Sequence, residues 1–465
     1  MKAPTSKSLK YCNEICRLGA PLVIAFLAQI GMQIVDTAML GQLGAKALAV
    51  GALGGTIIYT LISFSAGFLS PSGVFISEMR GARNNKHIPI IIKQGLLIAL
   101  ILSFLFIAIL YFSPFFLQFM ELDKELVEQT GLYLQTLAWG LPSILIFIIL
   151  RDFIVAFNYS KLVMIISLIA IPMNAILNSI LMYGLFGLPE LGLIGIGYST
   201  SITRIAMLCF LVVYIASNPR ICVLLRNASN HLTTFIQFKK MLTMGGSTGA
   251  MVGLEVGMFL MVTLFVGQIG VISLAAHQIA SQCVSVAFAI AFGLSQAANI
   301  RVAYVKGANK AHLVPVYTYA SLGLGLFCSS IIALLLVLGA KPIINLFFDS
   351  ELLANQEALG LAINLLCMAA ILQYFDSCQA ILLGVLRALK DTFVPMLLAI
   401  SSYWLLGVVS SYLLAFHMNW GTVGIWVGIC LGIGASSLFA YMRYLFINQR
   451  AVAIDDDQAV ILKTT

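Results

Sequence analysis

The chain has 465 residues, of which 61% are hydrophobic and only 9% are charged, and its mean hydropathy is +1.01. A soluble domain of this length would need more charged surface to face water, so the composition predicts an all-α, polytopic membrane protein. The net charge of +8 gives no support to a nucleic-acid partner, because the basic residues follow a membrane-topology pattern.

Apolar stretches of roughly 20 residues, separated by charged residues, Pro and Gly, predict about twelve membrane-spanning helices. In chain order these cover residues 18–40, 47–69, 88–112, 133–150, 162–182, 193–216, 241–266, 273–294, 314–339, 359–383, 395–416 and 423–446. The segment before them, Met1 to Arg17, is polar and basic. We therefore expect no cleavable signal sequence.

The distribution of Lys and Arg predicts the orientation of the chain. If the N-terminus is cytoplasmic, only Lys46, Lys124 and Lys341 of the 26 basic residues fall in outer segments. Arg204 alone falls deep within a predicted span, and the others fall in predicted cytoplasmic segments, among them Arg151 and, at the cytoplasmic ends of their spans, Lys93 and Arg443. Because basic residues concentrate on the cytoplasmic side of membrane proteins, we expect both termini in the cytoplasm.

Two internal similarities predict a duplicated chain. GQLGAKALAV at 41–50 matches GQIGVISLAA at 267–276, an offset of 226 residues, and MRGARNNKH at 79–87 matches VKGANKAH at 305–312. Six spans per half return the chain to its starting side, so the halves would share one orientation and pack as two lobes around a central cavity. The predicted parts are an N-terminal lobe (1–217), a cytoplasmic linker (218–240), a C-terminal lobe (241–447) and a cytoplasmic tail (448–465).

Besides Lys93 and Arg443 at the cytoplasmic ends of their spans, four charged residues lie inside the predicted spans. They are Asp36, Arg204, Glu255 and Asp376. A charge at the bilayer centre costs about 2.5–3.5 kcal/mol on insertion scales. One interpretation is that these residues pair as buried salt bridges that fix helix packing. Three carboxylates and one Arg cannot all pair, so at least two of the acids need a cation, a proton or solvent.

Polar side chains gather in the first, fifth and sixth predicted spans. They are Gln29, Gln33 and Asp36 in the first, Asn174 and Asn178 in the fifth, and Ser199, Thr200 and Ser201 in the sixth. The spacing in each of the first two sets keeps the side chains on one helical face. Amide carbonyls and a carboxylate are hard oxygen ligands that suit Na⁺, or a proton held on Asp36. Alternatively, the Asn pair joins neighbouring helices by hydrogen bonds.

In the second half, Glu255 lies between Gly253 and Gly257, which would allow another backbone to approach it closely. Gln278 in the next span can supply an amide, and Asp376 comes from the tenth span. Two acids that approach one another cannot both stay charged without a cation between them. We therefore expect this pair to bind Na⁺ or to take up a proton.

These features resemble the multidrug and toxic compound extrusion (MATE) transporters, and within them the NorM branch. The resemblance covers roughly residues 18–446 and is carried by DTAMLGQLG from Asp36, AAHQIA at 275–280, LGVLRALKDTFVPM at 383–396, and SYWLLGVVSSYLLAF from Ser402 followed by WGTVGIWVGICLG from Trp420. It implies two V-shaped lobes of six helices and efflux of bulky organic cations coupled to Na⁺ or H⁺. We expect a monomer in the bacterial inner membrane, with cationic and hydrophobic drugs and membrane lipid as partners and no cofactor.

The resemblance also implies roles for individual residues. Glu255 and Asp376 match paired acids of the C-terminal lobe, with Gln278 as a polar neighbour. The residues that match the cation and drug site of the N-terminal lobe are Asp36, Asn174, Asn178 and Thr200, with Gln33 and Arg204 in support. Phe288 stands where some NorM-type members have a tyrosine beside the cation, and this removes one possible oxygen contact.

Three other classes of membrane protein compete with this interpretation. A flippase-like exporter of a lipid-linked or metabolite substrate would tend to have a basic cavity, whereas this chain has three buried acids against one Arg. A membrane enzyme fits less well, because His277 and His417 lie on different helices without a patterned acid or metal partner. A channel is disfavoured because no segment repeats as a selectivity filter.

Overall fold

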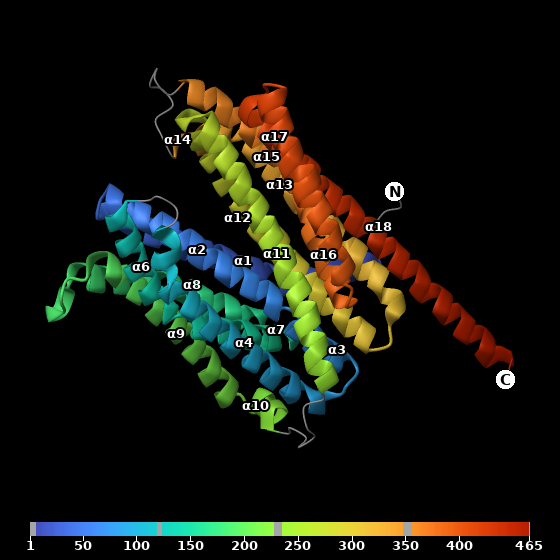
Figure 1. The fold of residues 1–465 in the computed structure, drawn as a ribbon. Helices are drawn as coiled ribbons and strands as arrows, with labels where there is room; N and C mark the ends of the chain where they lie inside the picture. The colour runs from blue at the N-terminus through green and yellow to red at the C-terminus, as the bar shows by residue number, and fades with distance from the viewer. Residues whose placement is uncertain (1–5, 119–122, 227–234, 347–355, 465) are drawn as a thin grey trace. The chain divides into compact units, whose positions relative to one another are not determined.

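The computed structural model describes residues 6–118, 123–226, 235–346 and 356–464, and within these ranges the chain forms helices and no β-strand (Figure 1). The helices of the first half are α1 (Ser6–Gln42), α2 (Ala45–Leu69), α3 (Pro71–Gly81), η1 (Asn85–His87), α4 (Ile88–Tyr111), α5 (Ser113–Leu117), α6 (Lys124–Ala138), α7 (Leu141–Ala156), α8 (Ser160–Tyr183), η3 (Leu185–Gly187), α9 (Gly192–Ser217) and α10 (Pro219–Arg226). Those of the second half are α11 (Phe235–Ile269), α12 (Val271–Gly307), η4 (Ala311–Leu313), α13 (Val314–Leu338), α14 (Ala340–Asn345), α15 (Gln356–Ala388), α16 (Phe393–Ala399), η6 (Ile400–Val408), α17 (Val409–Tyr412), η7 (Leu413–His417) and α18 (Gly421–Thr464). Residues 227–234 of the predicted linker lie outside the described ranges.

The prediction of an all-α, multi-pass membrane protein is confirmed. Within the described ranges, 11 helices are long and apolar enough to cross a membrane, and a bent pair, α6 and α7, supplies one more. The pair is bent by 43° where a single straight span over 133–150 was expected. The bend has a local cause, because Pro142 lies in the first turn of α7 and lacks the amide hydrogen that would continue α6.

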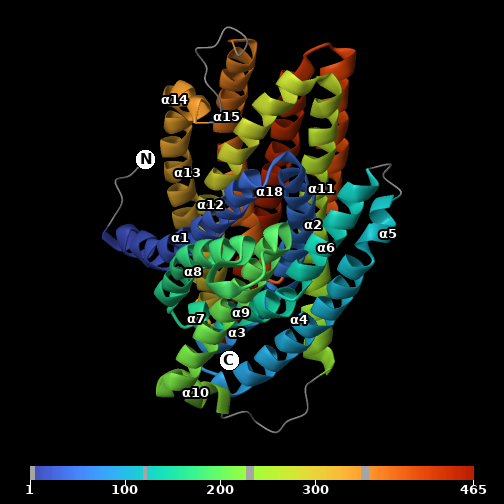
Figure 2. The same ribbon diagram turned by 90° about the vertical axis from the view of Figure 1, so that its left-hand side faces the viewer.

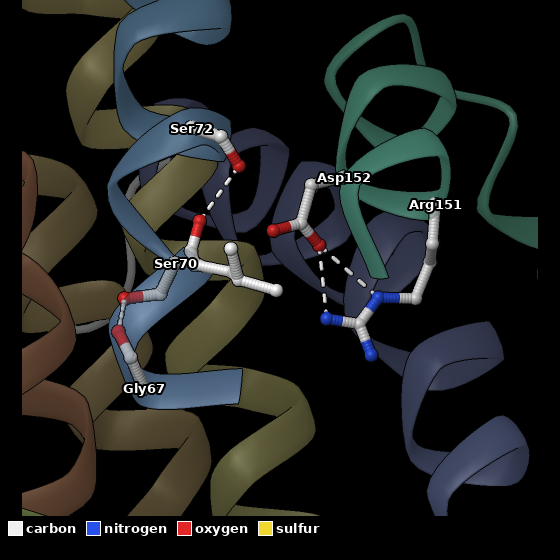
Figure 3. A network of polar contacts seen from close by, with 6 residues as sticks. Gly67, Ser70, Ser72, Arg151 and Asp152 are labelled. Carbon is white, nitrogen blue, oxygen red and sulfur yellow. Dashed lines mark hydrogen bonds and ion pairs between the residues drawn. The ribbon is translucent and has the colours of Figure 1, made fainter. Parts of the chain in front are cut away.

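The second predicted span also continues past its expected end, as α2 followed by α3. Pro71 cannot donate to the carbonyl of Gly67, so the Ser70 hydroxyl donates to that oxygen instead at 2.7 Å (Figure 3). The Ser72 hydroxyl donates to the Leu69 carbonyl at 2.7 Å. These two bonds satisfy carbonyls at the break and let the helix resume in the membrane.

Arg151, just past the end of the fourth predicted span, forms a buried ion pair in α7. Its Nη2 lies 2.9 Å from Oδ1 of Asp152, and the two residues are only 7% and 9% exposed (Figure 3). The guanidinium also lies 5.7 Å from the ring centroid of Phe26. Arg151 was expected in a cytoplasmic segment because the apolar stretch ends at Leu150, but α7 continues to Ala156.

The eleventh predicted span alternates between α-helical and π-helical turns. Helix α16 leads into the π-helix η6, which is followed by α17 and a second π-helix, η7. In η6 the amide of Val409 donates to the carbonyl of Trp404, and in η7 the amide of Met418 donates to that of Leu413 at 3.1 Å. Such wide turns are rare and frequently occur at functional sites.

The backbone repeats at the offset of 226 residues found in the sequence. Gly44 and Gly270 have φ angles of 107° and 147° and precede α2 and α12, respectively. Arg83 and Asn309 share a left-handed φ of 55° in the loops before η1 and η4. Both glycine positions favour glycine because a side chain is strained at these φ values. The two halves thus share turn geometry as well as sequence.

Contacts divide the chain into two units whose boundaries fall inside helices. The N-terminal unit is Ile24–Ala250, and the C-terminal unit combines Met1–Val23 with Met251–Thr465. The first part of α1 therefore belongs to the C-terminal unit, where the Tyr317 hydroxyl donates to Glu14 Oε2 at 2.6 Å. The first part of α11 belongs to the N-terminal unit, where a Cβ added at Gly245 would lie 2.4 Å from the Phe68 carbonyl oxygen. Of the predicted boundaries, the one after residue 217 lies between α9 and α10, whereas those after residues 240 and 447 lie inside α11 and α18.

Each unit is built around one deeply buried helix. In the N-terminal unit α7 packs against α3, α4 and α9, and nearly all of its side chains are buried. In the C-terminal unit α15 packs against α12, α13 and α18 (Figure 2). The site residues described next come from helices that pack within one unit at a time.

Candidate functional site

The N-terminal unit holds Asp36 between α8 and α9. The Oδ1 atom of Asp36 accepts a hydrogen bond of 2.7 Å from Asn178 Nδ2, and Oδ2 accepts one of 3.0 Å from the Thr200 hydroxyl. Residues 142 and 164 positions apart in the sequence are thereby brought together. Both carboxylate oxygens are bound by neutral donors, and these hydrogen bonds partly offset the cost of shielding the charged carboxylate from water.

A second layer of polar groups surrounds this carboxylate. Asn178 Nδ2 also lies 3.3 Å from Asn174 Oδ1, and the Ser199 hydroxyl donates to Asn178 Oδ1. Asn174, Asn178 and Ser199 are all 0% exposed. The Nδ2 atom of Asn174 is buried and has no hydrogen-bond partner among the described residues. Asn178 of the predicted pair therefore contacts the Asp36 carboxylate, and the same hydrogen bonds join α8 to α1 and α9.

Arg204 and Tyr133 complete the electrostatic surroundings of Asp36. Arg204 is 8% exposed and interacts electrostatically with both Asp36 and Tyr133. Its Nη1 atom has no hydrogen-bond partner among the described residues. Gly140 makes room for it, because a Cβ there would lie 3.1 Å from Arg204 Cδ. Tyr133, on α6, was not predicted, because this helix has polar residues along much of its length and none of them indicates a contact with Asp36.

Gln33 lies on α1 one turn before Asp36, and its side chain is exposed. Its carbonyl oxygen accepts a hydrogen bond of 2.9 Å from the Thr37 hydroxyl. Within the described part of the chain its side chain makes no hydrogen bond to Asp36, so a supporting role for Gln33 stays a prediction.

The C-terminal unit brings Glu255 of α11 and Asp376 of α15 close enough to interact electrostatically. Asp376 is 3% exposed and Glu255 is partly buried. Glu255 Oε1 accepts a hydrogen bond of 3.3 Å from Gln379 Nε2, which also comes from α15. The two acids predicted to form a pair therefore lie in one cluster. The amide that contacts Glu255 belongs to Gln379 of α15, whereas Gln278 of α12 was expected.

Tyr403 and Ser436 extend this cluster to η6 and α18. Gln379 Nε2 donates to the Tyr403 hydroxyl at 2.8 Å, and Ser436 Oγ lies 3.5 Å from the same hydroxyl. Gln379, Tyr403 and Ser436 were not predicted as site residues from the sequence. Gln379 follows Asp376 by three residues, which places the two on one helical face and could have identified it. Tyr403 gave no such signal, because the π-helical turns that orient it are not visible in a hydrophobic pattern.

The other predicted residues of this half lie on α12. Gln278 is exposed, and within the described ranges no hydrogen bond joins it to Glu255; its role stays a prediction. Its neighbour His277 is 2% exposed and accepts a hydrogen bond of 3.2 Å from Trp426 Nε1. Phe288 stacks on Phe292, with ring centroids 5.7 Å apart and planes inclined by 30°.

The chemistry available at both clusters is that of exchangeable small cations. Within the described ranges, Asp36, Glu255 and Asp376 lie in no ion pair, and no group of three or more His, Cys, Asp or Glu side chains could hold a metal ion. Carboxylates among neutral oxygens and amides can be neutralised by a proton or by an alkali cation. A duplicated, multi-pass helical protein with buried acids of this kind is typical of the class of membrane transporters.

Comparisons with known proteins agree with this class. The MatE family model matches residues 21–180 and 248–413. A probable multidrug resistance protein NorM of Burkholderia mallei is 33% identical over 95% of this chain and 94% of its own length. The multidrug resistance protein NorM of Vibrio cholerae is 31% identical over 95% and 97%, respectively. The chain therefore belongs to the MATE family, in its NorM branch, and is a transporter rather than an enzyme.

Solved structures show the same fold at lower sequence identity. The eukaryotic MATE transporter AtDTX14 superposes with a TM-score of 0.81 at 19% identity, over 94% of this chain and 96% of that one. A MATE crystal structure in the straight conformation gives a TM-score of 0.84 at 17% identity, over 95% and 96%. The family resemblance seen in the sequence is thus confirmed.

Proposed function

We propose that this chain exports organic cations across a bacterial inner membrane in exchange for Na⁺ or H⁺. The names of its relatives, multidrug resistance proteins of several bacteria, support a broad range of drug substrates. The enrichment of basic residues in the predicted inner segments supports placement of both termini in the cytoplasm.

The observation that carries this proposal is that neutral groups, and no basic side chain, make the hydrogen bonds to the Asp36 and Glu255 carboxylates among the described residues. Asp36 is bound by an amide and a hydroxyl, and Glu255 by an amide. A carboxylate paired with Arg or Lys would be permanently neutralised and would have no need of a mobile cation. Within the described ranges none of the three acids forms an ion pair, although Arg204 interacts electrostatically with Asp36. Such an acid binds a cation or proton when it is shielded from water and can release it when water reaches it.

Exchange follows if drug and coupling ion favour different conformations. Each ligand shifts the conformational equilibrium only by its difference in affinity for the two states. An organic cation that binds to one state and Na⁺ or H⁺ that binds to the other would then drive each other's transport. The buried acids provide this difference in affinity, because their electrostatic attraction for a cation is strong only where water is excluded.

Ethidium efflux in everted membrane vesicles tests the exchange. An outward-directed Na⁺ gradient or proton gradient, with the ion more concentrated in the vesicle lumen and imposed one at a time, should accelerate ethidium uptake into the lumen, and collapse of that gradient by an ionophore should abolish the acceleration. Vesicles with Asp36→Asn and Glu255→Gln together provide the inactive control. Ethidium transport that is indifferent to both gradients and requires ATP would overturn the proposal.

Reporter fusions test the orientation separately. A reporter placed after Lys240 should be cytoplasmic, and one placed within residues 123–128 should be periplasmic. The reverse pattern would contradict the proposed orientation without affecting the family assignment.

A further inference from the structure

In the side-chain amide of Gln379, the nitrogen has hydrogen-bond partners, whereas the oxygen has none among the described residues. The side chain is 1% exposed, and Nε2 donates both to Glu255 Oε1 at 3.3 Å and to the Tyr403 hydroxyl at 2.8 Å. Its Oε1 atom is buried and has no hydrogen-bond partner among the described residues. A buried amide oxygen without a partner is unfavourable and needs an explanation.

The two acids of this cluster cannot by themselves surround a cation. Glu255 and Asp376 supply two carboxylates, and within the described ranges no third acidic, His or Cys side chain joins them in a metal-binding group. An alkali cation is held by several hard oxygen atoms, and amide oxygens are among the ligands suited to it. Gln379 lies on the same helical face as Asp376 and in direct contact with Glu255, so it is placed to supply such an oxygen.

The orientation of the Gln379 amide is fixed from a second helix. Tyr403 is 0% exposed and lies in the π-helix η6, and Ser436 approaches its hydroxyl from α18. The next residue, Trp404, donates from Nε1 to the Leu254 carbonyl at 3.3 Å, directly before Glu255. The wide turn of η6 therefore ties the amide and α11 to the same short segment of chain.

We propose that the Gln379 amide oxygen is a Na⁺ ligand in the C-terminal unit, beside the Glu255 and Asp376 carboxylates, and that Tyr403 positions this amide. This role rests on the Na⁺ form of the exchange proposed above. It supplies from α15 a neutral oxygen that Phe288, which stacks on Phe292, cannot provide. Both ends of the Gln379 amide then have partners, the nitrogen within the protein and the oxygen on the ion.

Binding of ²²Na⁺ to the purified full-length protein, measured by scintillation proximity, tests this assignment. Gln379→Met removes the amide at nearly constant length and should weaken Na⁺ binding about 10- to 100-fold, as loss of a ligand or its support does at other metal sites. Gln379→Glu keeps an oxygen at the same reach and should retain binding. Tyr403→Phe should weaken binding by a smaller factor than Gln379→Met, because the amide stays but is less well oriented.

Gln373 offers a matched control on the same helix. It is also 1% exposed, its Nε2 donates only to the Ala287 carbonyl at 3.4 Å, and its Oε1 is likewise without a partner. Gln373→Met should leave Na⁺ binding unchanged. Ethidium binding in Na⁺-free buffer reports whether each variant is folded. If Gln379→Met does not fold, retained binding in Gln379→Glu together with weakened binding in Tyr403→Phe still supports the assignment.

The outcomes separate this assignment from the proposed exchange. Equal Na⁺ affinity in wild type, Gln379→Met and Tyr403→Phe overturns the role of Gln379 and leaves the exchange intact. Equal losses in Gln379→Met and Gln373→Met also overturn it, because any buried amide of α15 would then have the same effect. Absence of Na⁺ binding to the wild type overturns both the assignment and the Na⁺ form of the exchange, and leaves H⁺ as the coupling ion.

Discussion

The two units share a backbone pattern but place their acids at different positions along the repeated first helix. At the offset of 226 residues, Asp36 corresponds to Val262, which is 0% exposed, and Glu255 corresponds to Gln29. Glu255 thus lies two turns earlier in its own helix than Asp36 does, about 10 Å along the helix axis. Duplication preserved the scaffold, while the charged chemistry of the halves diverged.

The two clusters also differ in how their acids are neutralised. Asp36 has a neutral donor on each carboxylate oxygen, from two different helices. Glu255 has one amide donor and a second acid, Asp376, as its electrostatic neighbour. Like charges at close range require a cation or proton more strongly than a single hydrogen-bonded carboxylate does. We therefore expect the C-terminal cluster to carry the stronger dependence on the coupling ion.

Asp36→Asn should have the largest effect on transport. The substitution keeps the shape and most of the hydrogen bonding but removes the charge and the titratable proton, so coupled efflux of ethidium should fall to the level of empty vesicles. Expression and monodispersity on size exclusion should match wild type. Wild-type efflux by the folded variant would assign Asp36 to packing alone and break the comparison between the two clusters.

Glu255→Gln and Asp376→Asn should each remove the stimulation of efflux by an ion gradient, a coupling of about 5- to 150-fold. The double variant should be little worse than either single one, because the two acids act as one site. Efflux rates are compared with and without the imposed gradient. Two mild defects that simply add, with drug still driving ion movement in each single variant, would show that the acids act separately.

Thr200→Val should have an intermediate effect, confined to the N-terminal cluster. It removes one of the two hydrogen bonds to the Asp36 carboxylate, and a hydrogen bond to a charged group contributes about 1.5–3 kcal/mol. Affinity for ethidium or the coupling ion should therefore change about tenfold or more. Fluorescence titration of the purified variant measures this change, and an unaltered affinity would indicate that the hydroxyl does not support the carboxylate.

Ser436→Ala should have the smallest effect. Its hydroxyl lies 3.5 Å from that of Tyr403, at the limit of hydrogen bonding, and it touches neither acid. Na⁺ binding should stay close to wild type while Tyr403→Phe weakens it. If Ser436→Ala weakens binding as much as Tyr403→Phe does, the C-terminal cluster extends further into α18 than its geometry indicates.

The sequence by itself determined the number of spans, the duplication and the acids Asp36, Glu255 and Asp376. These features are local, because hydropathy identifies a membrane helix and an isolated charge stands out inside it. The resemblance to the MATE family further implied that Asp36 shares a site with Asn178 and Thr200, and both side chains donate hydrogen bonds to it.

Only the tertiary structure decided which helix segments pack in each unit and which side chains contact the acids. The first parts of α1 and α11 belong to the opposite units, and Gln379, Tyr403 and Tyr133 join the acids. The Arg151–Asp152 pair is buried although the apolar stretch ends just before it. Each of these features depends on which helices pack together and on how wide their turns are. Contacts between residues far apart in the chain set both, and a hydrophobic pattern along one helix does not record them.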